Sequence, residues 1–217
     1  MSQAFDGTIS IIGGSGDLGS AIARRLAKAG RKIIIGSRAV ESAAAAASRL
    51  GFGITGMTNE DAAAAGDIIF VTVPFAAQEV TLRSIAVKAA GKIVVDTTVP
   101  LVPPRVMRVL LPAEGCAAVR AQSILGDGVT LVSTFHNVAA HKLITDEDIK
   151  CDVLVFSDDK TARNQVVDLV NECGLCGLHA GALANSAAAE ALTSVLIFLN
   201  KTYNIDGAGI QITGIEL

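Results

Sequence analysis

Glycines and short polar residues gather in one segment whose spacing could bind a phosphate group. Residues 13–19 read Gly-Gly-Ser-Gly-Asp-Leu-Gly, so Gly14, Gly16 and Gly19 give the pattern G-x-G-x-x-G. In such loops the first glycine permits a tight turn, the second lets the backbone approach a pyrophosphate, and the third lets a helix pack on a strand. Free N–H groups at the helix start then bind the phosphates. A glycine-rich turn without a ligand is the alternative. We expect a dinucleotide site formed by Gly14, Ser15, Gly16, Asp17, Leu18 and Gly19.

The residues about 20 positions further on indicate whether such a site prefers NAD or NADP. A site for NAD places an acidic side chain there, which binds the ribose hydroxyls. This chain has Gly36, Ser37 and Arg38 instead, and the next acidic residue is Glu41. A carboxylate would repel a 2′-phosphate, whereas Ser37 and Arg38 can donate hydrogen bonds to one. The pattern therefore favours NADP(H), the alternative being an exposed Ser-Arg pair that follows an ordinary strand.

Other reactive side chains are few, and most have a structural explanation. His136 follows an expected buried strand, where it could polarise or position a ligand ring by donating a hydrogen bond, or could serve only in packing. Cys173 and Cys176 have the spacing of a redox motif, but we expect them at the C-terminal end of a helix, where the dipole disfavours a thiolate. Glu190 lies in an apolar helix, where a hydrogen bond between helices explains it as well as a chemical role does. We therefore name His136 as the candidate catalytic residue and expect no metal site.

Composition excludes several other classes of protein. The 217 residues are 51% hydrophobic and 18% charged, with a mean hydropathy of +0.50, which excludes a disordered chain. The net charge of −3 excludes binding of nucleic acid through a broad basic surface. No uninterrupted apolar run is long enough to cross a membrane, and four cysteines do not make a disulfide scaffold. We expect a cytoplasmic protein with no nucleic-acid or membrane partner.

Short β-branched runs alternate with longer alanine-rich segments, which predicts a parallel sheet between two layers of helices. After Pro100 the alternation lapses, and Pro103 and Pro104 predict a long irregular connection. We expect strands at 8–12, 32–35, around Ile54, 67–73, 92–96, 129–135, 152–157 and 177–179. We expect helices at 18–29, 40–50, 59–65, 77–90, 160–172 and 183–203.

These elements predict an α/β fold of the Rossmann type, with a doubly wound parallel sheet and a small C-terminal α/β cap. Residues 1–137 would form the NADP-binding domain, and residues 138–217 the cap and dimerisation region. The helix expected over 183–203 is apolar on nearly all sides, so something beyond its own sheet must cover it. Together with a strand-like tail at 209–214, it predicts a homodimer, because symmetric dimers are the commonest way to cover such a surface.

Several segments together resemble one family, the NADPH-dependent reductases of coenzyme F-420, an 8-hydroxy-5-deazaflavin, and in particular their bacterial branch. The resemblance extends in order over essentially the whole chain. The matching segments are 13–19, 36–38, 55–57 with 59–60, 71–74, 98–100, 135–140, 152–159, 180–185 and 207–214.

The resemblance implies NADP(H) as cofactor, F-420 as co-substrate, and a hydride that passes directly between the two rings. It places the nicotinamide near Thr72, Val73, Pro74, Val99 and the segment 136–140, which includes Ala139. The ring of F-420 would then occupy an apolar crevice lined by Phe75, Val99, Pro100, His136 and Leu183. Arg105 and Arg108 would meet its phosphate and glutamate tail, the alternative being that they lie in a solvated loop.

Two other functions stay open at the level of sequence. One is an NADPH-dependent reductase of another flavin or of a small imine or oxo compound. Related imine dehydrogenases usually add a helical domain of about 100 residues, and too little chain remains here for one. The other is an NADPH-binding sensor without turnover.

Overall fold

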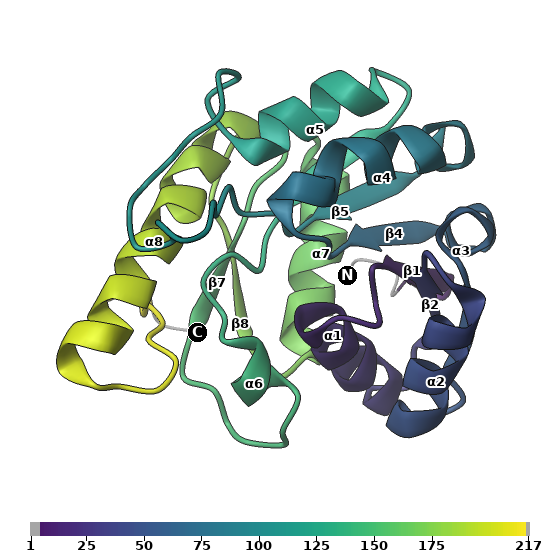
Figure 1. Cartoon of the computed structure of the whole chain (residues 1–217), viewed down its shortest axis with the longest axis horizontal. Helices are drawn as coiled ribbons and strands as arrows, with labels where there is room; N and C mark the ends of the chain where they lie inside the picture. Colours follow the sequence, from purple (N-terminus) through teal and green to yellow (C-terminus); the bar gives the residue numbers. More distant parts are fainter. Residues whose placement is uncertain (1–4, 216–217) are drawn as a thin grey trace.

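The computed structural model describes residues 5–215 and is built around one six-stranded sheet (Figure 1). Its strand order is β3-β2-β1-β4-β5-β6, and every neighbouring pair is parallel. The strands are β1 (Thr8–Ile12), β2 (Lys32–Ser37), β3 (Thr55–Thr58), β4 (Ile68–Val71), β5 (Ile93–Asp96) and β6 (Thr130–Ser133). The chain order reverses between β1 and β4, and ligands of such folds bind in the crevice at this point.

Helices cover both faces of this sheet, as the alternation of strands and alanine-rich segments predicts. They are α1 (Asp17–Lys28), α2 (Val40–Leu50), α3 (Asn59–Ala65), α4 (Phe75–Ala89) and α5 (Ala117–Leu125). Neighbouring strand residues bury their side chains in two different apolar clusters: Ile11 and Phe70 in one, Ile12 and Val71 in the other. Both faces are therefore buried, and the expected Rossmann-type fold is confirmed.

The C-terminal part of the chain adds a second, smaller sheet. It consists of two parallel strands, β7 (Asp152–Val155) and β8 (Cys176–His179), and a bridge between Ser133 and Phe156 joins it to the end of β6. The helices here are α6 (Ala140–Leu143), α7 (Lys160–Glu172), the 3₁₀ turn η1 (Leu183–Asn185) and α8 (Ser186–Tyr203). In Figure 1, α8 lies along one side of the molecule, remote from α1, α2 and α3.

Helix α5 lies inside the connection that the sequence predicts to be irregular. Pro103 and Pro104 lie well before it, and the segment from Ala117 onward contains no proline. The start of the helix is stabilised by Glu190, whose carboxylate accepts the N–H groups of Ala117 and Ala118 from 73 and 72 residues away. A local pattern cannot show such a distant cap, which explains the omission.

The predicted strand at 209–214 is wrong. This tail is irregular and lies beside the start of β7, where two hydrogen bonds join it to Asp152. The N–H of Asp152 donates to Ile210 O, and the Asp152 carboxylate accepts the N–H of Ile212. Because the acceptor for Ile212 is a side-chain carboxylate and not a backbone carbonyl, no regular ladder of backbone hydrogen bonds forms.

Helix α8 buries polar side chains together with Ala189 and Leu196, and leaves part of its apolar surface exposed. Ser186, Glu190 and Ser194 are buried, whereas Val195 and Phe198 are 43% and 51% exposed. Within the described residues, 183–203 is the one helical stretch long and apolar enough to cross a membrane by length and composition, and 33% of its most apolar window is buried. Its apolar outer face is left without a partner inside the described part of the chain.

Candidate dinucleotide site and the adjoining buried network

The loop between β1 and α1 uses its three motif glycines for different purposes. A Cβ on Gly14 would lie 2.6 Å from Ile11 O, and one on Gly19 would lie 2.5 Å from Thr72 Oγ1. Glycine at these two positions is therefore required by the fold itself. A Cβ on Gly16 would meet only Gly13 O, at 3.4 Å. The side of Gly16 that a Cβ would occupy is open, as expected where a ligand approaches the backbone.

The start of α1 offers unpaired N–H groups beside Gly16. Gly16 occupies the N-cap position, and no side chain caps the helix. The N–H groups in the first turn of a helix have no partner within the helix, so those of Asp17, Leu18 and Gly19 are available to an anion, which the helix dipole also favours. The Asp17 carboxylate lies in the same turn but is exposed and can point to solvent. These features fit a bound pyrophosphate.

Ser37 and Arg38 lie at the carboxyl end of β2, next to this loop. The Ser15 hydroxyl donates a hydrogen bond to Ser37 Oγ at 3.3 Å, so the structure brings the loop and the end of β2 together. Arg38 is exposed and makes no hydrogen bond or ion pair with any described residue. A serine hydroxyl and an uncompensated guanidinium at this position suit the 2′-phosphate of NADP.

Asn59 is a residue of this site that sequence reasoning missed. Its Oδ1 accepts the N–H of Gly13 at 3.3 Å, and a Cβ on Gly36 would lie 3.0 Å from the same atom. Asn59 thus fixes the glycine loop against the ends of β2 and β3. Its place at the start of an expected helix that follows a short strand was the available signal, because residues between a strand and the next helix meet at one edge of a parallel sheet.

The segment after β4 packs directly against the glycine loop. Thr72 donates both its N–H and its hydroxyl to Ile12 O, each at 2.9 Å. Gly13 has a φ of +73°, and a Cβ there would lie 2.7 Å from Val73 Cγ1. Pro74 then precedes the first turn of α4. The structure therefore brings Thr72, Val73 and Pro74 together with the loop at the point where the strand order reverses.

The other residues expected near the nicotinamide are more dispersed. Val99 follows β5, and its carbonyl accepts the N–H of Leu101 at 2.7 Å. Ala139 precedes α6, which packs against α1. Both lie beyond the carboxyl ends of the strands, but within the described residues no hydrogen bond joins either of them to the glycine loop. A cavity of about 620 Å³ opens beside the start of α1, with Asp17, Ala140 and Arg49 in its lining.

His136 lies at the expected edge of the sheet but is buried, with 4% of its surface exposed. Its Nε2 is 3.0 Å from Ser133 Oγ, its carbonyl accepts the Thr193 hydroxyl, and its Nδ1 is buried without a hydrogen-bond partner among the described residues. Burial lowers the pKa of His136 to about 3, so the imidazole is neutral at physiological pH. Phe135, directly before it, has a φ of 64°. This conformation is costly for a bulky residue and is common at functional sites.

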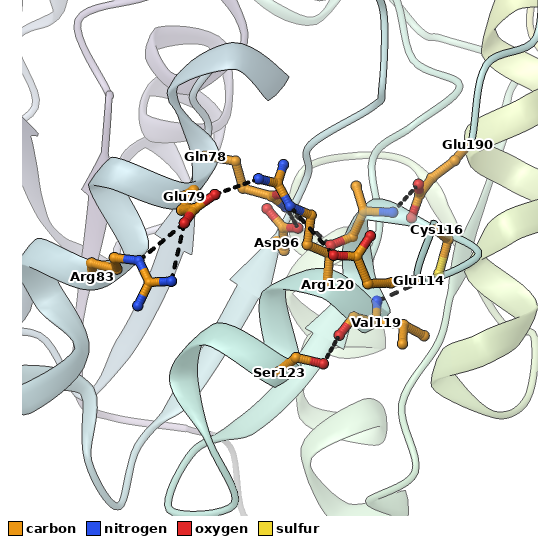
Figure 2. A network of polar contacts seen from close by, with 11 residues as sticks. Gln78, Glu79, Arg83, Asp96, Glu114, Cys116, Val119, Arg120, Ser123 and Glu190 are labelled. Carbon is orange, nitrogen blue, oxygen red and sulfur yellow. Dashed lines mark hydrogen bonds and ion pairs between the residues drawn. The ribbon is translucent and has the colours of Figure 1, made fainter. Parts of the chain in front are cut away.

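Glu190 is buried at the joint between α8 and α5, where Figure 2 shows it reaching the start of α5. Its Oε2 accepts the Ala117 N–H at 2.6 Å, while its Oε1 accepts the Ala118 N–H at 3.1 Å and the Ser186 hydroxyl at 2.9 Å. Burial raises the pKa of Glu190 to about 7, and these three hydrogen bonds oppose the rise. Two of its hydrogen bonds therefore join α8 to α5, and the third lies within α8.

A second buried carboxyl, Asp96 at the end of β5, connects to the same region (Figure 2). It accepts hydrogen bonds from Gln78 Nε2 at 2.7 Å and from the Thr98 hydroxyl at 2.6 Å. Gln78 Nε2 also donates to Ala117 O at 3.1 Å. Burial raises the pKa of Asp96 to about 6. Through these contacts one polar network links β5, α4, α5 and α8 and fixes the end of the strand that leads to Val99.

The crevice expected for the second ring is divided in the structure. Phe75 and Pro100 line a cavity of about 330 Å³ together with Arg120, whose guanidinium carbon lies 5.1 Å from the centre of the Phe75 ring. Leu183 lines a different cavity, of about 400 Å³, with Thr130 and Asp127 at the start of β6. The structure therefore does not bring Leu183 into the cavity of Phe75 and Pro100, and Asp158, which accepts the N–H of Leu183 at 3.1 Å, holds η1 beside the other cavity.

Arg105 and Arg108 lie in successive turns of the exposed segment after Pro104. Neither contributes to these two cavities.

The cysteines are placed as the sequence predicts. Cys173 is the C-cap of α7 and is buried, which raises the pKa of its thiol to about 12, and the pKa of Cys176 is raised to about 11, mainly by burial. Neither thiol is activated. Within residues 5–215, no three His, Cys, Asp or Glu side chains are grouped so as to hold a metal ion.

Comparison with known proteins shows the family of this chain. Residues 8–100 match a family model described as NADP oxidoreductase, coenzyme F-420-dependent. The F-420-dependent NADP reductase of Methanothermobacter thermautotrophicus is 37% identical over 220 residues, which cover 95% of each chain. The chain belongs to the F-420-dependent NADP reductase family. Another member, from Methanocaldococcus jannaschii, is 38% identical over 96% of this chain and 99% of its own.

A solved structure has the same fold as this chain. It comes from Arthrobacter sp. FB24 and carries a provisional name as an F-420-dependent NADP reductase. Its TM-score to this chain is 0.84 at 23% identity, covering 95% of this chain and 99% of that one. At this level of identity the likeness concerns the fold.

Proposed function

We propose that this protein transfers a hydride between NADP(H) and the deazaflavin coenzyme F-420. The relationship to F-420-dependent NADP reductases over 95% of both chains is the observation that carries the proposal. The geometry of the first half of the chain supports its NADP part. Small-molecule redox partners are also what the family implies.

The described residues fit NADP at the crevice between β1 and β4. Gly16 and the first turn of α1 would hold the pyrophosphate, and Ser15, Ser37 and Arg38 the 2′-phosphate. Thr72, Val73 and Pro74 would border the nicotinamide, because they pack against the glycine loop where the strand order reverses. Val99 and Ala139 are included on the resemblance and on their place at the same edge of the sheet.

The reaction asks the protein mainly to orient its two ligands. When bound, NADPH supplies a hydride and F-420 accepts it. Holding two reacting carbons about 3–3.5 Å apart in a water-free site lowers the barrier by several kcal/mol. Apolar side chains such as Val73, Pro74 and Val99 exclude water there, and neutral His136 polarises or positions without adding charge. Neither a metal nor a covalent intermediate on the protein takes part in this proposal.

The direct test mixes the protein with NADPH and oxidised F-420. We expect the visible absorbance of the deazaflavin to fall as NADPH is consumed, and deuterium from one face of stereospecifically labelled NADPH to appear in reduced F-420. If F-420 is inert while FMN, FAD or an imine is reduced, the named acceptor is wrong. If no acceptor reacts although NADPH binds tightly, the protein is a sensor rather than a reductase.

The exposed face of α8 supports a homodimer. Val195, Phe198 and Tyr203 are 43%, 51% and 68% exposed, and Ile205 and Ile212 extend this apolar surface into the tail. A second copy of the chain would cover it by symmetry. The opposite face of α8 contacts α5 through Glu190, a bond that a helix surrounded by lipid would not make.

The same proposal includes the domain boundaries of the chain and its location in the cell. Residues 1–137 would form the NADP-binding domain and residues 138–217 the cap, a division supported by the separate β7-β8 sheet. A cytoplasmic location is supported by four free cysteines, three of them buried, because thiols stay reduced there.

A further inference from the structure

Four buried side chains form an unbroken hydrogen-bonded chain from α8 to the end of β6. Glu190 Oε1 lies 2.9 Å from Ser186 Oγ, Ser186 Oγ lies 2.8 Å from Ser133 Oγ, and Ser133 Oγ lies 3.0 Å from His136 Nε2. Ser133 and Ser186 are fully buried, and Glu190 is 1% exposed. Water therefore does not complete these bonds, and each hydroxyl must donate and accept within the chain.

The direction of every bond follows from the charge of Glu190. An ionised carboxylate only accepts, so the Ser186 hydrogen must point to Glu190. Ser186 Oγ then accepts from the Ser133 hydroxyl, since its own hydrogen is used. Ser133 Oγ in turn accepts from His136, which must carry its hydrogen on Nε2. The chain leaves Nδ1 without a hydrogen and able only to accept.

The geometry points to Glu190 as a positioning residue that selects the tautomer of His136 through Ser186 and Ser133. The inference deepens the proposed function, because it decides whether His136 presents a hydrogen-bond acceptor or a donor on its Nδ1 side. With Glu190 ionised, His136 can accept a hydrogen bond at Nδ1, for example from an amide N–H of a ligand, and cannot donate one there. The Ala117 and Ala118 N–H groups hold the carboxylate at the α5 start and so support this state.

Protonation of Glu190 reverses the direction of all three hydrogen bonds between Glu190 and His136. One proton is taken up in total: each of the three shared hydrogens moves one atom toward Glu190, and the added proton ends on His136 Nδ1. Since burial places the pKa of Glu190 at about 7 and that of His136 at about 3, the imidazole changes tautomer near neutral pH without becoming charged. The titratable groups that face Glu190 are Asp96, whose charge raises its pKa, and the Cys116 thiol at the start of α5.

The test is ¹⁵N NMR of the full-length protein with labelled histidine, without ligand. The chain has three histidines, and His141 and His179 are exposed, which provides internal controls. We expect wild-type His136 to carry its hydrogen on Nε2 at pH about 9 and on Nδ1 at pH about 5, with a midpoint near 7. An imidazolium signature for His136, or one tautomer throughout, would overturn the inference.

Two substitutions separate positioning from simple support of the fold. Glu190→Gln keeps the volume but cannot take up or release a proton, so we expect a single His136 tautomer at every pH in this range. Ser186→Ala interrupts the chain at a position where only a hydroxyl is lost, so the midpoint near 7 should disappear. Thermal unfolding and NADPH affinity establish that each variant is folded. A folded Glu190→Gln protein whose His136 tautomer still follows pH as in the wild type would refute the role of Glu190.

Turnover distinguishes this inference from the proposed function. If the protein does not reduce F-420 but the His136 tautomer loses its pH dependence in Glu190→Gln, the acceptor is wrong and the positioning role is correct. If F-420 is reduced and the tautomer does not respond, the opposite holds. Where both are correct, we expect Glu190→Gln to abolish the component of the kcat–pH profile near pH about 7, with a smaller effect on the KM for NADPH.

Discussion

At the scale of single residues, the glycines of the loop between β1 and α1 are of two kinds: Gly14 and Gly19 are required by the fold, and Gly16 by a ligand. Gly14 and Gly19 leave no room for a Cβ, since one would lie within 2.6 Å of Ile11 O or 2.5 Å of Thr72 Oγ1. Gly16 has room on the protein side and a φ of −78° that any residue can adopt. Its lack of a side chain therefore benefits the ligand rather than the loop.

Gly16→Ala should accordingly lose NADPH affinity while staying folded. Alanine lowers the entropy of the unfolded chain but is a poorer N-cap than glycine, and these effects, each about 1 kcal/mol or less, are opposite in sign. We expect a dissociation constant raised about tenfold or more by isothermal titration calorimetry. Gly19→Ala is the contrasting variant, whose unfolding temperature should fall. Unchanged NADPH affinity in Gly16→Ala would refute the assignment of this loop.

Arg38 should supply most of the preference for NADPH over NADH. A hydrogen bond to a charged group contributes about 1.5–3 kcal/mol, which corresponds to roughly 10- to 150-fold in affinity. We expect Arg38→Ala to lose a factor in this range for NADPH and to bind NADH as before. Arg83→Ala, on the exposed side of α4, is the matched control and should change neither constant. Equal affinities of the wild-type protein for NADPH and NADH would contradict this prediction.

At the scale of elements, Asp96 and Gln78 hold β5, α4 and α5 together, and this contact depends on pH. Asp96 keeps its proton up to pH about 6 in the folded protein, whereas the unfolded chain releases it near 3.8. Between these values the folded state binds more protons, so the contribution of Asp96 to stability falls as pH rises.

Asp96→Asn should remove this pH dependence. Relative to the variant, the wild-type free energy of unfolding should fall by about 2 kcal/mol as pH rises from about 4 to about 7. Urea unfolding of both proteins at a series of pH values measures this difference, which includes the smaller effect of the Asp96 charge on the pKa of Glu190. A constant difference across the series would show that Asp96 titrates normally.

At the scale of the whole molecule, the apolar face of α8 should be the surface that a second copy covers. Phe198→Asp places a charge in the centre of that face and should convert a dimer into a monomer of 22.2 kDa without unfolding it. Val87→Asp is the matched control, since Val87 is 85% exposed on α4, away from α8. Light scattering at micromolar concentration distinguishes the species. A wild-type protein that is already monomeric would contradict the dimer.

Much of the architecture could be predicted because its causes are local. The strand Thr8–Ile12 and helices such as Val40–Leu50 and Lys160–Glu172 follow from periodicity and from the glycines or polar residues that end them. Helix α5 could not be predicted in this way, since its start is stabilised by Glu190 from the far end of the chain. The tail after Gly209 reads as a strand, but the Asp152 side chain takes the place of a backbone partner.

The amino-acid sequence by itself determined the kind of site: a glycine loop before a helix, and Ser37 and Arg38 where an NAD site would have an acid. These features depend on residues close together in the chain, so the sequence alone predicts their chemistry. Only the tertiary structure decided that Asn59 holds Gly13, that Leu183 and Phe75 line different cavities, and that Glu190 reaches His136 through two serines. The physical reason is that burial and long-range packing determine which polar groups must satisfy one another once water is excluded.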